Sequence, residues 1–392
     1  MLKCLTCIHG LSMGTALIDT IKHHFSSLPD PRRETLNMRH NFYDILTIAI
    51  CGVICGADDW TQIARFGEAK KVWFGTFLEL PNGIPSHDTF NDVFAKMDPE
   101  VFQAGFIAWV ASMADLIPKD VVAIDGKTLR RSYDKASSKA AIHMVSAWCT
   151  SNQLILGQLK TEEKSNEITA IPRLLQLLSL KDSLVTIDAM GCQQKIAAQI
   201  VEQGADYLLG VKENQSTLYD TIHERFIEAE DKQFTTDFTD CTELDKDRHG
   251  RFDKQRCYVS QTLNGMEDIT VKWLGLTTLV VIESEATEQA RTTLERRFYI
   301  SSRVASADYF LKSVRRHWEI ENKLHWVLDV AYREDDSRHR LGYSAENFAV
   351  LRHISLNLIK KEKTDKAGVK TKRLKAGWDH EYLRTVLMGL AT

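Results

Sequence analysis

The sequence predicts an α/β protein built around a mixed β-sheet, and three observations support this fold class. First, an apolar run that ends in Asp125 indicates a buried strand. Second, two more β-rich segments follow it with a Ser-Asn turn between them, which favours a hairpin. Third, helical and apolar segments alternate from residue 166 onward. Three consecutive strands followed by alternating helices and strands are the order of a ribonuclease-H-like mixed sheet.

The elements of this predicted core have defined positions in the chain. We expect strands at residues 121–125, 140–150, 153–161, 184–188 and 205–211. We expect helices at residues 166–178, 191–203 and 216–230. The first strand should stop at the turn Gly126-Lys127. A doubly wound sheet would instead require a helix between the first two strands, and the intervening residues are too polar to supply one.

A helical domain is expected ahead of the core, at residues 14–118, after a lead-in at residues 1–13 that need not be ordered. Its helical segments are residues 42–55, 60–77 and 102–116, with a further helix that begins after the natural N-cap Ser86. A domain of this kind suits either the binding of DNA ends or simple packing, and both alternatives stay open.

From residue 119 onward, the chain is expected to divide into four sections. We expect the first part of the core at residues 119–230, a β-rich insertion at 231–304, the second part of the core at 305–359 and a basic C-terminal tail at 360–392. Strand-like segments of the insertion are residues 255–261, 269–274, 279–283 and 297–301. The tail is rich in lysine and arginine, which suits either phosphate contact or plain solvation.

Composition narrows the class of protein. The 392 residues are 44% hydrophobic and 26% charged, as in an ordinary soluble globular chain. The net charge of −3 provides no global basic field, so nucleic-acid binding must depend on local patches. Eight scattered cysteines without zinc spacing indicate reduced thiols in a cytoplasmic protein. The longest apolar run is shorter than the roughly 20 residues of a membrane span, and no signal peptide is visible.

Two aspartates follow predicted core strands directly. Asp125 ends the run VVAID, and Asp188 ends the run LVTID. Because ligands bind outside the carboxyl ends of such strands, the pair indicates two carboxylates that converge on one metal site. The alternative is that each aspartate only caps the turn after its strand.

A third acid, Glu321, lies on a predicted helix over residues 314–330. Apolar residues occupy the same face at helical spacing, so the carboxylate is set in an apolar stripe. A buried, unpaired carboxylate costs several kcal/mol, so Glu321 should be paired, protonated or bound to a metal. A salt bridge to Arg315 or Arg316 is the simpler alternative.

Four motifs, in this order, carry a resemblance to a known family. They are IDGK at residues 124–127, TIDAMG at 186–191, YLLGVKENQ at 207–215 and HWEIEN at 317–322. Together they resemble those of the bacterial insertion-sequence DDE transposases, of the H-repeat-associated type. The resemblance extends from about residue 26 to residue 390.

The resemblance implies a catalytic triad of Asp125, Asp188 and Glu321, on a ribonuclease-H-like core that a β-rich insertion interrupts. These acids would bind two Mg²⁺ ions, for which Mn²⁺ can substitute, with Asp125 as the bridging ligand. The wider superfamily has tyrosine, arginine and lysine around the glutamate. Those positions are Val314, His317 and Leu328 here, so phosphate contacts must come from Arg315, Arg316 or Lys323.

The implied function is metal-dependent cleavage at the ends of an insertion sequence, followed by strand transfer into target DNA. The implied partners are double-stranded DNA and, on synapsed ends, a second copy of the chain, with no membrane partner; the protein would be cytoplasmic and associated with the nucleoid when acting. Two alternatives are a stand-alone nuclease of the same fold and a catalytically silent or domesticated DNA-binding protein derived from a transposase.

Basic residues near the predicted site and in the insertion are the candidates for phosphate contact. They are Lys127, Lys212, Arg248, His249, Arg251, Arg256, Arg316 and Lys323, with Lys254 beside them in the insertion. The alternative for the cluster in the insertion is a solvated hairpin tip.

Overall fold

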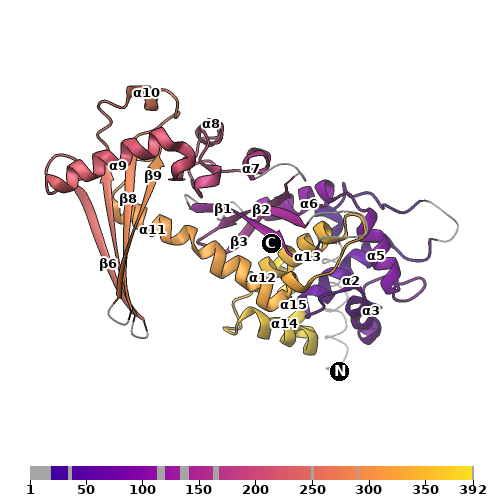
Figure 1. Ribbon diagram of the computed structural model, residues 1–392. Helices are drawn as coiled ribbons and strands as arrows, with labels where there is room; N and C mark the ends of the chain where they lie inside the picture. Colours follow the sequence, from indigo (N-terminus) through magenta and orange to yellow (C-terminus); the bar gives the residue numbers. More distant parts are fainter. Residues whose placement is uncertain are drawn as a thin grey trace.

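The computed structural model describes residues 19–33, 38–112, 120–132, 141–161, 167–248, 251–288 and 291–390. The predicted lead-in of residues 1–13 lies outside these ranges. Within them, one mixed sheet of nine strands runs through the molecule in the order β3-β2-β1-β4-β5-β9-β8-β7-β6 (Figure 1). Helices cover both faces of its first half, and a helical bundle closes the end of the molecule opposite the last strands (Figure 1).

The first half of the sheet is the ribonuclease-H-like core. Its strands are β1 (Val121–Leu129), β2 (Ile142–Cys149), β3 (Leu154–Lys160), β4 (Leu184–Ile187) and β5 (Asp206–Val211). The first three form an antiparallel meander, and β4 and β5 run parallel to β1. Two helices connect the later strands, α7 (Glu167–Gln176) and α8 (Gln194–Glu202). The predicted fold class is therefore confirmed.

The predicted end of the first strand is wrong. β1 does not stop at Asp125 and turn at Gly126-Lys127, but continues to Leu129. The cause is that its two edges are paired over different lengths: pairing with β4 ends at Ile124, whereas pairing with β2 continues to Leu129. Asp125 is consequently the first residue of β1 beyond the parallel pairing, at the edge where β4 also ends.

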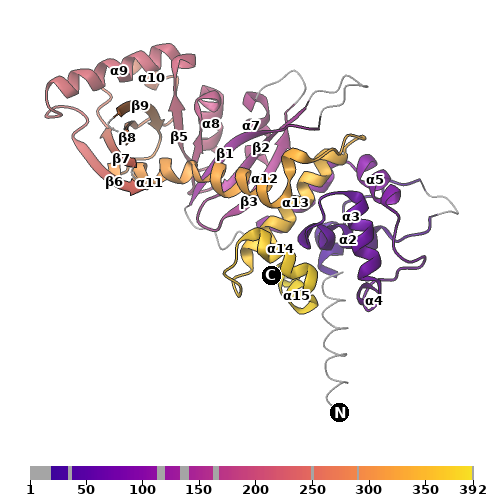
Figure 2. The same cartoon turned by 60° about the horizontal axis from the view of Figure 1, so that its bottom comes forward.

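The insertion is an extension of the same sheet rather than a separate one. After α9 (Ser216–Asp231), it contains β6 (Asp240–Arg248), β7 (Arg251–Ser260), α10 (Glu267–Thr270), β8 (Thr278–Glu288) and β9 (Arg291–Ser301). β9 pairs antiparallel with β5, so four long strands project beyond the core as an arm (Figures 1 and 2). We call β6 to β9 the arm. α9 lies along one face of the arm (Figure 1).

The strand predicted at residues 269–274 is wrong, because this segment begins as α10 and continues in turns. Its apolar residues alternate in the sequence, which suggested a strand. In the fold, however, Met266 and Trp273 are buried with Ile269 packed between them, while Val271 is 85% exposed. Spacings of three and four residues are helical, and the amide of Trp273 donates to the carbonyl of Ile269.

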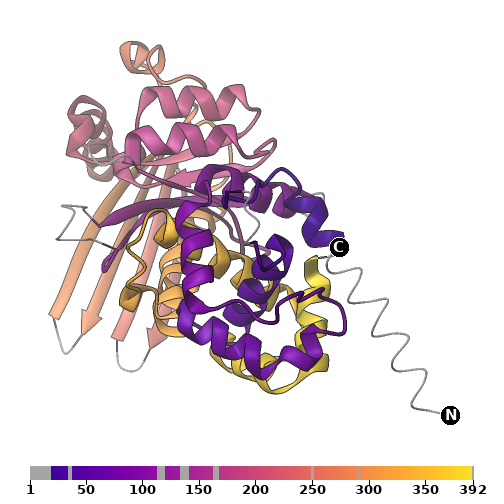
Figure 3. The same ribbon diagram turned by 90° about the vertical axis from the view of Figure 1, so that its right-hand side faces the viewer.

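Helices from both ends of the chain form one bundle. The N-terminal helices are α2 (Phe42–Ile54), α3 (Trp60–Ala69), α4 (Lys71–Phe74), α5 (His87–Lys96) and α6 (Pro99–Ser112). The C-terminal ones are α12 (Trp326–Tyr332), α13 (Ser344–Lys361), α14 (Val369–Trp378) and α15 (His380–Leu387), whereas α11 (Ala307–His317) packs on the sheet and the arm. α13 is almost wholly buried and contacts α2, α5 and β3, so it joins the bundle to the sheet (Figure 3).

Ser86 caps α5 as predicted, since its hydroxyl accepts from the amide of Thr89. The basic segment after α13 is folded, and two of its cations are inside the protein. Lys372 bridges to Glu362 at 3.1 Å, and Arg373 donates to the carbonyl of Val53 at the end of α2. Among the residues described, no helix is both long and apolar enough to cross a membrane.

Candidate active site

The two predicted aspartates lie side by side at one edge of the core sheet, because each follows the last residue of the parallel pair Ile124–Ile187. Asp188 is also the N-cap of the short helix at Ala189–Gly191, since its carboxylate accepts from the amide of Met190 at 3.0 Å. Turn capping and a place in the site, which the sequence left as alternatives, therefore hold together for Asp188.

Glu321 reaches the same region from an interrupted helix. The predicted continuous helix over residues 314–330 is wrong: α11 ends at His317, and Glu321 opens a π-helical turn, Glu321–His325, that leads into α12. A π turn holds one more residue than an α turn, which shifts the faces of the helix. Glu321 is exposed rather than set in the apolar stripe, and Arg316 lies 3.7 Å from Asp120 instead.

One cavity of about 980 Å³ joins all three acids. Asp125, Asp188 and Glu321 line it from the core, and the start of the arm forms another wall through β9. Cations in the lining include Lys212, just after β5, and Arg297 of β9, whose guanidinium also pairs with Glu295 at 2.8 Å. The guanidinium of Arg297 lies over the ring of Trp318, 4.6 Å from its centre.

Burial and mutual repulsion make the aspartates reluctant to ionise together. Burial and the nearby carboxylates of Glu167, Asp188 and Glu321 raise the pKa of Asp125 to about 7. Burial, with Glu167, also raises the pKa of Asp188. His325 lies 3.6 Å from Asp125, but burial lowers its pKa to about 4, so at neutral pH the imidazole gives no counter-charge.

The donor set fits a divalent cation of the Mg²⁺ type, since carboxylate oxygens line the cavity and a dication would relieve their repulsion. In the described ranges, no three histidine, cysteine or acidic side chains are already close enough to share one ion. The chemistry of the residues, rather than their present spacing, supports a metal here.

The positions around Glu321 that differ from the wider superfamily are apolar or neutral in the structure. Val314 and Leu328 are buried in the core. His317 is hydrogen bonded through Nδ1 to the hydroxyl of Thr186 at 2.9 Å, and burial lowers its pKa to about 4. None of the three therefore supplies a positive charge at neutral pH, and the cations of the cavity wall come from elsewhere.

Several cations predicted to contact DNA have acidic partners within the protein. Lys127 is 12% exposed and contacts Asp329 and Glu334. Two others pair nearer the surface, namely Arg316 with Asp120 and Lys323 with Glu319. Lys212 lies in the cavity beside Asp188. Of the predicted cations whose side chains the structure describes, Lys212 is therefore the one that lines the cavity.

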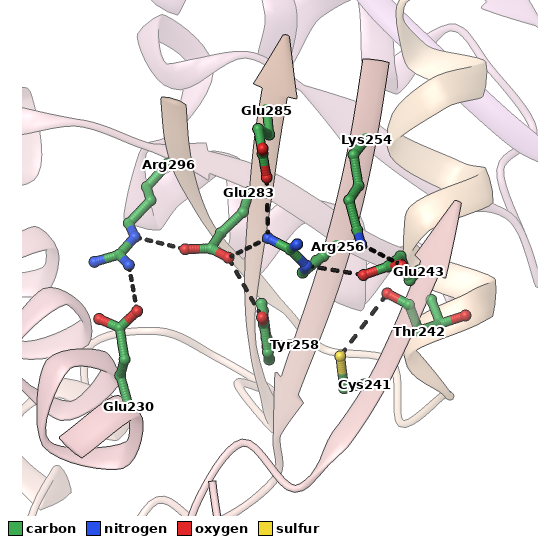
Figure 4. A network of polar contacts seen from close by, with 10 residues as sticks. All are labelled: Glu230, Cys241, Thr242, Glu243, Lys254, Arg256, Tyr258, Glu283, Glu285 and Arg296. Carbon is green, nitrogen blue, oxygen red and sulfur yellow. Dashed lines mark hydrogen bonds and ion pairs between the residues drawn. The ribbon is translucent and has the colours of Figure 1, made fainter. Parts of the chain in front are cut away.

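The basic cluster of the arm divides into two groups. Arg256 lies 2.8 Å from Glu243 and 3.5 Å from Glu285, and Lys254 also bridges to Glu243 (Figure 4). Figure 4 shows this as part of a ladder of alternating charges across β6 to β9. Arg248 and Arg251 are the paired ends of β6 and β7 at the hairpin tip. Their side chains, and the whole of His249, lie outside the described residues.

Glu167, the first residue of α7, is a fourth acid near the two aspartates that the sequence did not reveal. Neither its spacing from Asp125 nor that from Asp188 distinguishes it from other helix-starting acids. The available signal was an acid in the first turn of the helix that follows the third strand.

Comparisons with known proteins identify the family of the chain. The family described as "Transposase DDE domain" matches residues 117–358, and the domain associated with it matches residues 22–110. The chain is 41% identical to the "H repeat-associated putative transposase YhhI" of Escherichia coli K12, over 94% of this chain and 98% of that protein. It is 40% identical to the "Putative transposase YncI" of Escherichia coli O157:H7, over 94% and 95%.

Among solved structures, a piggyBac transposase synaptic complex with hairpin DNA aligns with 99% of this chain and 80% of that one, at 10% identity and a TM-score of 0.39. That similarity is too low to support an argument about this chain. The family match covers more than half of the chain, and the relatives match along nearly their whole length. On this evidence the chain belongs to the bacterial DDE transposase family.

Proposed function

We propose that this protein cleaves DNA at the ends of an insertion sequence and transfers the freed strands into target DNA, with Asp125, Asp188 and Glu321 as its catalytic acids. The observation that carries the proposal is their convergence: two strand ends and a π turn bring three distant carboxylates to one cavity. Chains of this family are generally dependent on divalent metal ions, which agrees with the carboxylates of this cavity.

The three acids would hold the Mg²⁺ ions. Bound Mg²⁺ supplies a nucleophilic water at neutral pH and stabilises the charge that develops on the phosphate. The protein's own contribution is to hold the acids on rigid elements and to position DNA. The sheet fixes the backbone at Asp125 and Asp188. A hydrogen bond from the backbone amide of Met190 also keeps the carboxylate of Asp188 at the edge of the sheet.

Lys212 and Arg297 are proposed to bind the phosphates on either side of the cleaved bond. Both line the cavity at the junction of β5 and β9, since Val211, the residue before Lys212, pairs with Phe298, the residue after Arg297. They replace the cations that the wider superfamily has around the glutamate. Double-stranded DNA is accordingly the proposed partner, and a second copy of the chain is proposed to join when two ends are held together.

The decisive test replaces each acid by its amide. Asp125→Asn, Asp188→Asn and Glu321→Gln should each abolish cleavage of DNA that carries the gene's flanking sequences, because each removes a metal ligand. Binding of the same DNA should persist within about threefold, since a single carboxylate contributes little to phosphate binding. Glu213→Gln, which changes another acid of the cavity wall, is the control and should cleave normally. Wild-type cleavage in a triad variant would remove that residue from the mechanism.

This test also separates the proposal from a silent DNA-binding protein. A silent protein would bind DNA without cleaving it in any metal, and the triad variants would then match the wild type in every assay.

A second prediction concerns which metal ion supports cleavage. Mg²⁺ and Mn²⁺ should restore activity to the chelator-treated protein, because an all-oxygen site favours hard ions. Ca²⁺ should not, since it binds in a looser geometry that misplaces the reacting groups. Rates are compared by gel assay at equal free concentrations of each ion. Full activity in chelator, or a requirement for Zn²⁺, would contradict the prediction.

A further inference from the structure

One face of β1 is held against the segment that contains the π turn and α12. Asp125 and Lys127 lie on this face together, because side chains alternate along a strand. Nδ1 of His325 lies 3.6 Å from Oδ2 of Asp125, and Asp329, four residues after His325, pairs with Lys127. The ammonium of Lys127 also lies 3.4 Å from the carbonyl oxygen of His325. Two positions of the helical segment therefore contact two positions of the strand that carries Asp125.

The two carboxylate oxygens of Asp125 have different neighbours. Oδ1 accepts a hydrogen bond from the backbone amide of Gly126 at 2.9 Å, whereas Oδ2 faces the ring of His325. The distance to His325 is longer than a hydrogen bond, and a movement of about half an ångström would form one. Hydrogen bonds in active sites are often long in this way before the substrate is bound.

The ring of His325 is suited to donate this hydrogen bond. Its side chain is 13% exposed, and its Nε2 is buried without a hydrogen-bond partner among the described residues. Burial lowers the pKa of His325 to about 4, so the ring carries one proton at neutral pH. With this proton on Nδ1, the ring can donate to the ionised carboxylate of Asp125. With the proton on Nε2, a lone pair would face the carboxylate and the donor would have no acceptor.

His325 ends the π turn that Glu321 begins. Residues four apart in a helix lie on the same side of it, which places both side chains toward the site. Glu321 lines the cavity, whereas His325 is not part of the lining that the described residues form and contacts Asp125 instead. This one turn therefore supplies an acid to the cavity and a hydrogen-bond donor to another acid.

We propose that His325 is a positioning residue for Asp125, in which Nδ1–H donates to Oδ2 and holds the carboxylate toward the cavity. The inference rests on the proposed function, which makes Asp125 a catalytic acid. His325 touches neither DNA nor a cation in this role and acts only through Asp125. Replacing groups that orient the acids of metal-dependent sites typically lowers activity or metal affinity by about 10- to 100-fold.

Three variants of the full chain test the role of the ring. Asparagine places its amide nitrogen close to the position of Nδ1, glutamine places it close to that of Nε2, and leucine has no donor. His325→Asn should cleave DNA that carries the gene's flanking sequences nearly as fast as the wild type. His325→Gln and His325→Leu should cleave it at least about tenfold more slowly.

Equal rates in His325→Asn and His325→Leu, whether fast or slow, would show that the ring only fills space and would overturn the proposal. Circular dichroism establishes that each variant is folded. If His325→Leu is not folded, the comparison of His325→Asn with His325→Gln decides, because both carry an amide and differ only in where it lies.

The position of the ring proton gives a readout that does not depend on activity. Long-range proton–nitrogen NMR spectra of the chain with isotopically labelled histidine show which ring nitrogen is protonated, and His325→Asn assigns the signal by its loss. At about pH 8, where Asp125 with its pKa of about 7 is mostly ionised, we expect the proton of His325 on Nδ1. Asp125→Ala, which removes the acceptor, should shift this signal. A proton on Nε2 in the wild type, or a signal that ignores Asp125→Ala, would overturn the proposal.

The outcomes separate this inference from the proposed function. If the wild type cleaves DNA, Asp125→Asn does not and all three His325 variants match the wild type, His325 has no positioning role and the triad stands. If the wild type cleaves no DNA in any metal, the proposed function fails and this inference fails with it.

Discussion

At the scale of single residues, Lys127 is a motif residue whose charge is already paired within the protein. It is two positions after Asp125, yet its partners Asp329 and Glu334 lie some 200 residues further along the chain. Glu334 is 2% exposed. The lysine therefore ties β1 to α12 and to the segment that follows it.

Replacing Lys127 tests this structural role. Lys127→Met should lower the free energy of unfolding by about 3 to 5 kcal/mol, because it leaves the buried carboxylate of Glu334 without its closest cation. Urea denaturation measures the loss. Lys323→Met is the matched control: its pair with Glu319 is partly exposed, so the change should be less than about 1 kcal/mol. A small effect at Lys127, together with weaker DNA binding, would favour its sequence-based role as a phosphate contact.

At the scale of elements, the arm carries two kinds of cation. Some are already paired with acids of the arm, whereas others are still only predicted to contact DNA. Arg256 has three glutamates within 4 Å, counting Glu283 at 3.9 Å with Glu243 and Glu285. Binding a phosphate would require it to give up these partners. The hairpin tip that carries Arg251 is at the far end of the arm from the core (Figure 1).

The two arginines should differ in the salt dependence of DNA binding. Arg251→Ala should reduce the magnitude of the slope of log K against log salt by roughly 0.9, as one phosphate contact is lost on duplex DNA. It should weaken binding to cognate and random DNA alike, because phosphate contacts carry no sequence information. Arg256→Ala should leave the slope unchanged. If the two variants show the same slope as the wild type, the tip is a solvated turn and DNA follows another path.

The sequence predicted most elements of the core because their patterns are local. The strands before Asp125 and Asp188 are apolar runs, and an apolar run that ends in an acid can be recognised from the sequence alone. The site was harder. The π turn at Glu321 has no mark in the spacing of apolar residues, which alone suggested one straight helix. Glu167 was missed because its place beside Gly126 and His143 depends on the pairing of β1 with β2 in the folded sheet.

At the scale of the whole molecule, contacts around Glu362 hold the C-terminal helices of the bundle together. Glu362, between α13 and α14, accepts hydrogen bonds from Thr364 and from the hydroxyl of Tyr382, and bridges to Lys372 at 3.1 Å. Burial raises the pKa of Glu362, but these hydrogen bonds outweigh burial and lower the pKa to about 2. The segment expected to be a basic tail is thus folded around a buried acid.

The pH dependence of stability follows from that lowered pKa. An acid with a lowered pKa stabilises the fold above its usual value of 4.5, and this stabilisation is lost as the pH falls towards 2. Glu362→Gln should therefore cost about 2 kcal/mol at pH 7 and progressively less between pH 4.5 and 2. Thermal unfolding at a series of pH values measures the difference. A difference that is constant over this range would show that the carboxylate charge contributes nothing.

The continuous sheet also limits how relatives of this chain can diverge in length. Side chains alternate between faces along β9: Arg296 contacts Glu230 on α9, and Arg297 stacks on Trp318 beyond α11. One residue inserted into β9 would move each of these two side chains to the opposite face of the sheet. Because β9 pairs with β5, this shift in register would alter the wall of the cavity. Lengthening at the hairpin tips leaves this register intact. Arms of different length should therefore differ at their tips, or by even numbers of residues within the strands.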